Sequence, residues 1–566
     1  MTSAPSSPTA PPAPKRAINP WLALAFIAIP VFIGSIDLTI VTAFLPEIIV
    51  DLELPVQSVL DDAAWIVTGY LLAYTISLIF MGRLSDLIGR RRAYVLCLIV
   101  FMIGSFIVAE VDPQAENGVA GLIYDIAYRI GGVRPDSGSV ALATIILGRI
   151  VQALGAGAIV PVSLALVGDL FPPNKRAQPF GAIGAIDTLG WVLGHLYGGI
   201  MVRWFSDLNR QIAEGSAGAL SVFGTTLPPL DWRMLFWINI PVSLIGLALT
   251  WWALRGVPQT RSASRMDWLG TILVSGALVA LVLGLGANIE ISSSASSFDE
   301  VSGLPPYAVP VLALSALLFA AFIFVELRTR DPVFDLRMMR RRAVASGLVT
   351  NFVVGFCLMI GLVSVPILVN IRIPDSSYLA EAALQVGILL SALTVPMALA
   401  AIPGGWLSER IGNSRTALLG MALAAIGFAA IWRTWTLDVA DSLVALEMVF
   451  VGVGLGLTFS PISASVINNA DEDKLGVASA LVIIMRLLGM TIGISALTAF
   501  ASQRLASLAT AELGANAGAD PFAALDVYSR LTVFVLTEIA LIGLILSLLA
   551  LIPAWWLRQR QAASTE

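Results

Sequence analysis

Charged side chains are scarce in this sequence. Only 13% of its 566 residues are Asp, Glu, Lys or Arg, whereas 57% are hydrophobic. Soluble domains carry about 25% charged residues, so a chain with so few of them cannot cover its apolar surface in water. Because a membrane-spanning helix needs about 20 apolar residues, this length can supply fourteen spans. We therefore predict an all-α polytopic membrane protein.

Histidine and cysteine are also nearly absent. His195 is the only histidine, and the two cysteines, Cys97 and Cys357, both lie in long apolar runs. A disulfide framework, a histidine metal cluster and a Ser-His-Asp triad are therefore not expected. No lysine follows a glycine, as the Walker phosphate loop would require. We expect no enzyme, no metal and no cofactor, and a net charge of −5 without a basic stripe gives no reason to expect nucleic-acid binding.

Apolar stretches of spanning length recur along the whole chain. They begin after residues 1–20, a tail rich in Ala, Ser, Thr and Pro that we expect to be disordered and cytoplasmic. The predicted spans are Trp21–Pro46, Ala63–Met81, Ala93–Ala109, Val140–Leu170, Pro179–Met201, Met234–Leu254, Trp268–Asn288, Tyr307–Leu327, Val344–Asn370, Leu384–Trp406, Thr416–Trp432, Leu443–Asn468, Leu475–Phe500 and Leu531–Trp556.

Lysine and arginine are concentrated at one set of span ends. Residues 90–92 and 340–342 are two such clusters, and cytoplasmic loops carry this excess. We therefore predict a multi-pass protein of the cell (inner or plasma) membrane with both termini in the cytoplasm.

An internal repeat divides the chain into two parts. The segment beginning at Gly82 recurs in degenerate form at Gly405, and the Gly-x-Gly with a following proline at Gly155 recurs at Gly454. Two six-helix halves around a central cavity are a transporter architecture. We predict a half at 21–255, two inserted helices at 256–330, a cytoplasmic linker at 331–342, a second half at 343–558 and a short tail at 559–566.

Five motifs carry a family resemblance. Gly82–Arg92 (G-R-L-S-D-L-I-G-R-R-R) resembles the loop signature of the major facilitator superfamily. Asp37–Pro46, Arg149–Gly157 and Asp231–Pro241 resemble the first-, fourth- and sixth-helix motifs of its fourteen-helix drug:proton antiporters of the EmrB/QacA type. Gly190–Gly199 resembles their fifth-helix motif, with His195 in place of a proline. The resemblance implies the major facilitator fold and proton-driven export.

Two charged residues lie deep inside predicted spans. Asp37 is about 24 Å from the cytoplasmic end of its span, at 1.5 Å per residue, and intramembrane charges often mark an ion or substrate path. The family resemblance implies that Arg149 faces this helix. We predict an Asp37–Arg149 pair that loosens on protonation, or alternatively a permanent ion pair that holds the first half together.

Further candidates lie in the fifth and thirteenth spans. Asp187 and His195 are about two turns apart and are candidate proton-coupling residues, although a solvated carboxylate and a structurally hydrogen-bonded histidine are the alternatives. Arg486 is a candidate for an anionic substrate group or for pairing across the cavity. We expect Asp37, Asp187, Trp191 and Arg486 to line the substrate cavity.

The loop signature predicts a gate, with topology signalling by its arginines as the alternative. Asp86 is expected to accept hydrogen bonds from the free amides that begin the third span. The residues assigned to this gate are Gly82, Asp86, Gly89, Arg90, Arg91, Glu409 and Arg410. The four-residue spacing of Gly190, Gly194 and Gly198 favours close helix packing.

The outer loops are long. Residues 119–130 and 204–215 have the pattern of amphipathic helices, which leaves open contact with the outer leaflet, cover of the exit, or docking of an extracytoplasmic partner. Glu447 and Glu538 are expected near helix ends, where their side chains reach water.

These observations predict a proton-coupled secondary transporter that exports small amphipathic or lipophilic compounds, as in multidrug efflux and antibiotic resistance. Its expected partners are the substrate, protons and the lipid bilayer. One alternative is a dedicated lipid or metabolite exporter of the same fold. Another is a membrane sensor or scaffold without transport.

Overall fold

A computed structural model gives the fold of the chain. It describes residues 18–52, 63, 65–214, 221–222, 225–226, 230–257, 261–262, 265–285, 307–335, 337–372, 379–513 and 521–557. Nearly all of these residues are helical. The one sheet within the described ranges is a short antiparallel pair formed by β1 (Ser221–Val222) and β2 (Thr225–Thr226).

The long helices follow the predicted spans and extend past them at several ends. They are α1 (Pro20–Asp51), α3 (Trp65–Ile88), α4 (Arg90–Ala109), α5 (Gly118–Gly131), α6 (Ser137–Leu170), α7 (Ala177–Ala213), α8 (Arg233–Ala253), α9 (Trp268–Leu285), α11 (Ala308–Glu326), α12 (Arg342–Asn370), α13 (Leu379–Ile411), α14 (Asn413–Thr434), α15 (Asp441–Asn468), α16 (Leu475–Leu513) and α17 (Pro521–Ala554). Short 3₁₀ helices are η1 (Pro173–Lys175), η2 (Leu254–Gly256), η4 (Met338–Arg340) and η6 (Glu472–Lys474).

Thirteen helices among the described residues are long and apolar enough to cross a membrane. The predicted count of fourteen is therefore not confirmed. The predicted fifth span lies in α7, a 37-residue helix in which several side chains, including that of His195, lie outside the described residues, and this helix is not among the thirteen.

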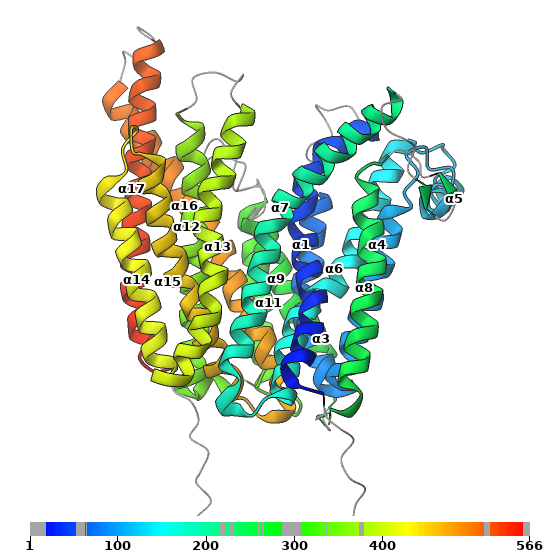
Figure 1. Ribbon diagram of the computed structural model, residues 1–566, viewed down its shortest axis with the longest axis horizontal. Coiled ribbons are helices and arrows are strands. Elements are labelled where there is room, and N and C mark those ends of the chain that lie inside the picture. The colour runs from blue at the N-terminus through cyan, green and yellow to red at the C-terminus, as the bar shows by residue number, and fades with distance from the viewer. Residues whose placement is uncertain are drawn as a thin grey trace, which may run out of the picture.

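The helices form two groups, shown in Figure 1. The N-terminal group contains α1 and α3–α8, and the C-terminal group contains α12–α17. The inserted helices α9 and α11 pack on each other, and α9 also contacts α3 and α16. The two groups converge at the end of the bundle where α1 begins and α17 ends. We call this end, which carries Arg90, Arg176, Arg341 and Lys474, the basic end.

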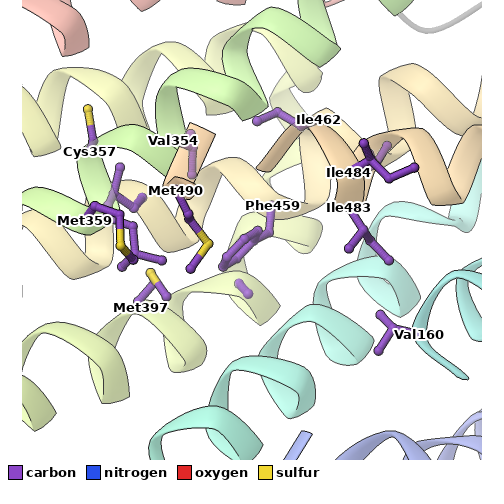
Figure 2. Close-up of a cluster of buried hydrophobic side chains, with 14 of the residues drawn as sticks. Val160, Val354, Cys357, Met359, Met397, Phe459, Ile462, Ile483, Ile484 and Met490 are labelled. Carbon is purple, nitrogen blue, oxygen red and sulfur yellow. The ribbon is translucent and has the colours of Figure 1, made fainter. Parts of the chain in front are cut away.

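The core contains both branched and flexible apolar side chains. Figure 2 shows Met359 of α12, Met397 of α13 and Met490 of α16 near Phe459 of α15, and all of these residues are buried. Methionine is unbranched and polarizable and fills irregular gaps. This part of the C-terminal group can therefore repack more easily than a core of β-branched residues.

Two predictions about the outer segments have different outcomes. The amphipathic helix expected near residues 119–130 exists as α5. The separate helix expected at 204–215 does not exist, because residues 204–213 continue α7 without a break. No proline or glycine lies between Trp204 and Ala213 to interrupt the helix.

Candidate functional site

A buried polar cluster surrounds Asp37 within the N-terminal group. Arg149 Nη1 donates to Asp37 Oδ2 at 2.6 Å, and each side chain is only 1% exposed. Gln152 Nε2 and Asn239 Nδ2 both donate to Asp37 Oδ1, at 2.9 and 2.7 Å. Gln152 also donates to Ser105 Oγ at 2.8 Å. We call Asp37, Ser105, Arg149, Gln152 and Asn239 the Asp37 cluster.

Helix packing brings the members of this cluster together. Arg149 and Gln152 are three residues apart on α6, so they lie on the same face of that helix, and Gln152 Oε1 accepts a hydrogen bond from Arg149 Nη1 at 2.7 Å. A Cβ on Gly104 of α4 would lie 2.2 Å from the Gln152 backbone nitrogen. Glycine therefore allows α4 to approach α6 closely at this point. The Arg149 guanidinium also lies 3.9 Å from the centre of the Tyr70 ring, a distance typical of a cation–π contact.

A second ion pair connects the two groups of helices. Arg486 Nη2 of α16 donates to Asp187 Oδ2 of α7 at 3.1 Å, and Ser35 Oγ of α1 donates to Asp187 Oδ1 at 2.7 Å. Asp187 is 4% exposed. The Arg486 guanidinium lies 4.7 Å from the centre of the Phe459 ring. We call this the bridging pair, because movement of one group away from the other must break it.

The rest of α7 near Asp187 packs on α1. Thr39 Oγ1 donates to the backbone oxygen of Trp191 at 2.9 Å, and the Trp191 side chain is partly buried against the core. Added Cβ atoms on Gly190 and Gly194 would lie 2.5 Å from Ser35 Cβ and 2.0 Å from Thr39 Oγ1. Gly198 is a buried position of the same helix. The structure therefore places Gly190 and Gly194 where α7 meets α1, while the side chain of His195 lies outside the described residues.

The basic end holds the two groups together through Asp86. The backbone amides of Gly476 and Val477, in the first turn of α16, donate to Asp86 Oδ1 and Oδ2 at 2.9 and 3.1 Å. The expectation that Asp86 caps the third span is therefore wrong, because the helix it caps belongs to the other group. The third span, α4, begins instead at Gly89, which has φ +95° and makes no side-chain cap bond.

Arginines extend this contact. Arg90 forms ion pairs with Asp86 and Asp169 and donates to the Glu472 backbone oxygen at 2.6 Å. Arg176 of the N-terminal group donates to Asn468 Oδ1 at 3.2 Å. These bonds join the N-terminal group to η6 and α15 of the C-terminal group.

The degenerate copy of the signature lies in the C-terminal group and makes the equivalent contact with a helix of the N-terminal group. Glu409, at the end of α13, accepts a hydrogen bond from the Gln178 amide at the start of α7 at 3.2 Å. Gly412 begins α14 with φ +93°, as Gly89 begins α4. Arg91 and Arg410 lie over the Trp251 and Trp406 rings, at 3.7 and 3.9 Å from the centroids. In each copy of the repeat, therefore, a carboxylate of one group accepts hydrogen bonds at the start of a helix of the other group: Asp86 at α16 and Glu409 at α7.

Comparison with known families identifies the fold. The profile described as Major Facilitator Superfamily matches residues 27–380 and 352–565. The chain belongs to the Major Facilitator Superfamily. It is therefore a polytopic membrane protein, and both this family and its named relatives point to a transporter rather than an enzyme.

Curated relatives of this superfamily member are named for a lipid. The chain is 30% identical over 486 residues to a protein of Mycobacteroides abscessus named triacylglyceride transporter. The aligned region covers 84% of this chain and 81% of that protein. A protein of Mycolicibacterium smegmatis with the same name is 28% identical over 524 residues. That alignment covers 91% of this chain and 81% of the relative.

Solved structures share the fold at low sequence identity. The human organic anion transporter MFSD10 aligns with a TM-score of 0.51 at 14% identity, covering 95% of this chain and all of that chain. A bacterial homologue of the human lysosomal transporter Spinster, solved in an inward-facing conformation, aligns with a TM-score of 0.50 at 18% identity. The alignment covers 97% of this chain and all of that chain.

The structure adds residues that the sequence analysis did not select. Gln152, Asn239 and Ser35 complete the two buried polar sites. Gln152 and Asn239 lie inside the motifs that resemble the family's fourth and sixth helices, so their place in those motifs was an available signal. Glu447 was expected to reach water but is 2% exposed, and it accepts hydrogen bonds from Thr434 Oγ1 and Trp435 Nε1. Glu538 pairs with Arg504 at 2.8 Å.

Substituting Gly476 by alanine should loosen the basic end. The new Cβ would lie 2.3 Å from Ser85 Oγ and 2.4 Å from the Gly82 backbone oxygen, and overpacking of this kind costs about 1–3 kcal/mol. We expect several-fold faster labelling of a cysteine introduced at Ala480, measured with a membrane-impermeant maleimide. Gly387→Ala is the matched control, because its Cβ would meet nothing within 4 Å. Equal labelling in both variants would contradict the prediction.

A further ion pair at the basic end gives a pH-dependent prediction. Partial burial raises the pKa of Asp335, but hydrogen bonds from Lys474 Nζ and the Arg337 amide, with the charges of both residues, outweigh burial and lower the pKa overall. A lowered pKa means that the pair stabilises the fold above the ordinary aspartate pKa of about 3.9 and loses this effect as the pH falls below it. Asp335→Asn should therefore cost about 0.5–1 kcal/mol at neutral pH. Thermal unfolding in detergent should show that the difference from the unsubstituted protein shrinks as the pH falls below the ordinary aspartate pKa of about 3.9.

Proposed function

We propose that this chain is a secondary transporter that exports a lipid or another uncharged lipophilic metabolite by alternating access. The observation that carries the proposal is the bridging pair: Asp187 is already neutralised by Arg486 at 3.1 Å. A site with balanced charge suits an uncharged substrate better than a cationic drug, because a buried carboxylate that attracts a cation must first lose its partner.

Two further findings support a lipid substrate. The relatives in Mycobacteroides abscessus and Mycolicibacterium smegmatis are named triacylglyceride transporters. Arg486 also stacks on Phe459, which lies near three methionines in Figure 2. A pliable apolar region beside the bridging pair fits acyl chains of variable shape.

Alternating access requires two bodies that separate at each end in turn. We assign these bodies to the N-terminal and C-terminal groups, with α9 and α11 inserted between them in sequence. Their contacts through Asp86 and Glu409 would close the basic end in this conformation. The excess of basic residues there supports a cytoplasmic location for that end, and hence for both termini, in the inner or plasma membrane.

Protons are the proposed energy source. Asp37 and Asp187 are carboxylates buried among transmembrane helices, each paired with an arginine. Protonation of either carboxylate would remove the charge that holds its arginine, and the freed side chain could then change partner as the groups move. His195, on the same helix as Asp187, remains a candidate for proton transfer, and Trp191 for substrate contact.

Multidrug export is the second candidate function. It is favoured by the resemblance of the Asp37, Arg149 and Gly190 motifs to fourteen-helix drug antiporters. It requires Asp187 to release Arg486 in order to face a cationic substrate. The two candidates therefore differ in whether the bridging pair stays closed when substrate binds.

The test uses the purified chain in liposomes with an imposed pH gradient. A glyceride labelled with a dithionite-sensitive fluorophore reports movement between leaflets, and a lipophilic cationic dye reports drug transport. Gradient-dependent movement of the glyceride alone supports the proposal, whereas movement of the dye alone would replace it with multidrug export. Movement of neither probe, in a protein that retains its fold, would favour the sensor or scaffold alternative.

A further inference from the structure

Helix α5 lies on the side of the N-terminal group, next to the ends of α4 and α6 and away from the basic end (Figure 1). One of its faces is packed: Ala120 is fully buried in a small cluster with Ala115 and Val140, and Ile123 and Tyr124 pack against that cluster. This face fixes the rotation of α5 about its own axis.

A second face is apolar and uncovered. Leu122, Ile126 and Ile130 are 60%, 49% and 83% exposed. Their four-residue spacing places them on one stripe of the helix, which we call the apolar edge. Asp125 and Arg129, which are also exposed, lie along one border of that stripe, so α5 has a core face, an apolar face and a charged face.

The loop before α5 sets the level at which the helix begins. Asp112 accepts hydrogen bonds from the Gln114 and Glu116 amides at 3.1 and 3.3 Å, which keeps the loop compact. Gly118 has φ +64°, and a Cβ on it would lie 3.3 Å from Cγ of Glu110, the residue that follows α4. Helix α5 therefore starts directly beside the end of α4.

Near that end, α4 has an exposed apolar surface. Ile99, Ile103 and Phe106 are exposed along one side of α4, which is one of the thirteen helices fit to cross a membrane. Phe106 makes an edge-to-face contact with Trp237 of α8, at 5.7 Å between centroids, and both rings are partly exposed. Exposed aromatic residues near helix ends mark the boundary between membrane and water.

We propose that α5 is an interfacial helix whose Leu122–Ile126–Ile130 edge lies in the lipid of the adjacent leaflet. The edge continues the exposed apolar surface of α4 at the level where the membrane boundary falls. Asp125 and Arg129 remain in the headgroup region or in water, as in other amphipathic helices that lie in the membrane plane. This surface is separate from both buried ion pairs, so the inference does not depend on the transported substrate.

The experiment uses the full chain in nanodiscs, with one cysteine introduced at a time and labelled with an environment-sensitive fluorophore. Cys97 and Cys357 are retained, because both are completely buried. Leu122→Cys and Ile126→Cys test the apolar edge, and Asp125→Cys is the matched control on the charged face. Quenching is measured with iodide in the buffer and with lipids that carry a nitroxide near the headgroup end of the acyl chain.

The expected result is several-fold stronger quenching by the nitroxide lipid than by iodide at positions 122 and 126, with the reverse at position 125. Quenching by iodide at all three positions would overturn the proposal. Shielding of positions 122 and 126 from both quenchers would also overturn it, because another protein surface would then cover the edge. Each labelled variant is first checked for an unchanged elution profile and unfolding temperature, and Ile130→Cys replaces any edge variant that fails this check.

Discussion

Replacing Asp187 by asparagine should reduce gradient-driven transport by more than tenfold. Asp187 accepts hydrogen bonds from Arg486 of the other group and from Ser35. Its loss would leave the guanidinium of Arg486 without its partner carboxylate, and breaking a buried pair in this way costs about 3–5 kcal/mol. The conformation that contains the bridging pair would be depopulated. Transport of the labelled glyceride in liposomes measures the effect.

Two further variants separate charge pairing from a general loss of structure. Asp187→Glu keeps the charge and should retain part of the activity. The exchanged pair Asp187→Arg with Arg486→Asp should recover more transport than either single substitution, because the attraction between α7 and α16 is restored with opposite polarity. If the exchanged protein folds and is no better than the single variants, the bridging pair does not control the conformational change.

Replacing Asp37 by asparagine should abolish the dependence of transport on the pH gradient. In the Asp37 cluster, the carboxylate accepts hydrogen bonds from Arg149, Gln152 and Asn239. An asparagine cannot gain or lose a proton in this range, so the cycle loses the group that we assign to coupling. Substrate exchange at equal pH on both sides should continue, within about threefold of the unsubstituted rate. Paired measurements with and without the gradient separate these two effects.

The structural alternative for this cluster predicts a different pattern. If the Asp37–Arg149 pair only holds the N-terminal group together, Asp37→Asn should lower the unfolding temperature and reduce driven transport and exchange equally. Asn239→Ala is a suitable control, because it removes one neutral donor from Asp37 but leaves the carboxylate and its arginine. It should weaken coupling less than Asp37→Asn does. Equal losses in driven transport and exchange would favour the structural role.

The sequence by itself determined the class and the repeated plan of this protein. Low charge density and long apolar stretches require a lipid environment for the chain. The copies of one signature at Gly82 and Gly405 correctly indicated the Major Facilitator Superfamily. These features are local or compositional, so they can be read without knowing which helices touch. The predicted count of fourteen spans is not confirmed, because thirteen helices among the described residues are long and apolar enough to cross a membrane.

Sequence reasoning also selected Asp37, Arg149, Asp187 and Arg486, because charges within apolar stretches are costly and stand out. It proposed the Asp37–Arg149 pair from the family resemblance, and for Arg486 it left open an anionic substrate group or a partner across the cavity. It did not select Gln152 or Asn239 as hydrogen-bond donors to Asp37, because neutral amides in a membrane helix do not stand out as charges do, although both lie inside the family motifs.

Only the tertiary structure decided which residues meet between the two groups. It paired Asp187 with Arg486 and placed Asp86 at the start of α16 rather than α4. The reason is physical: these contacts join residues hundreds of positions apart, and their geometry depends on how α3, α7 and α16 pack. A hydrophobic pattern specifies that each helix is buried in the membrane or in the bundle, but it does not specify which neighbour its polar side chains reach.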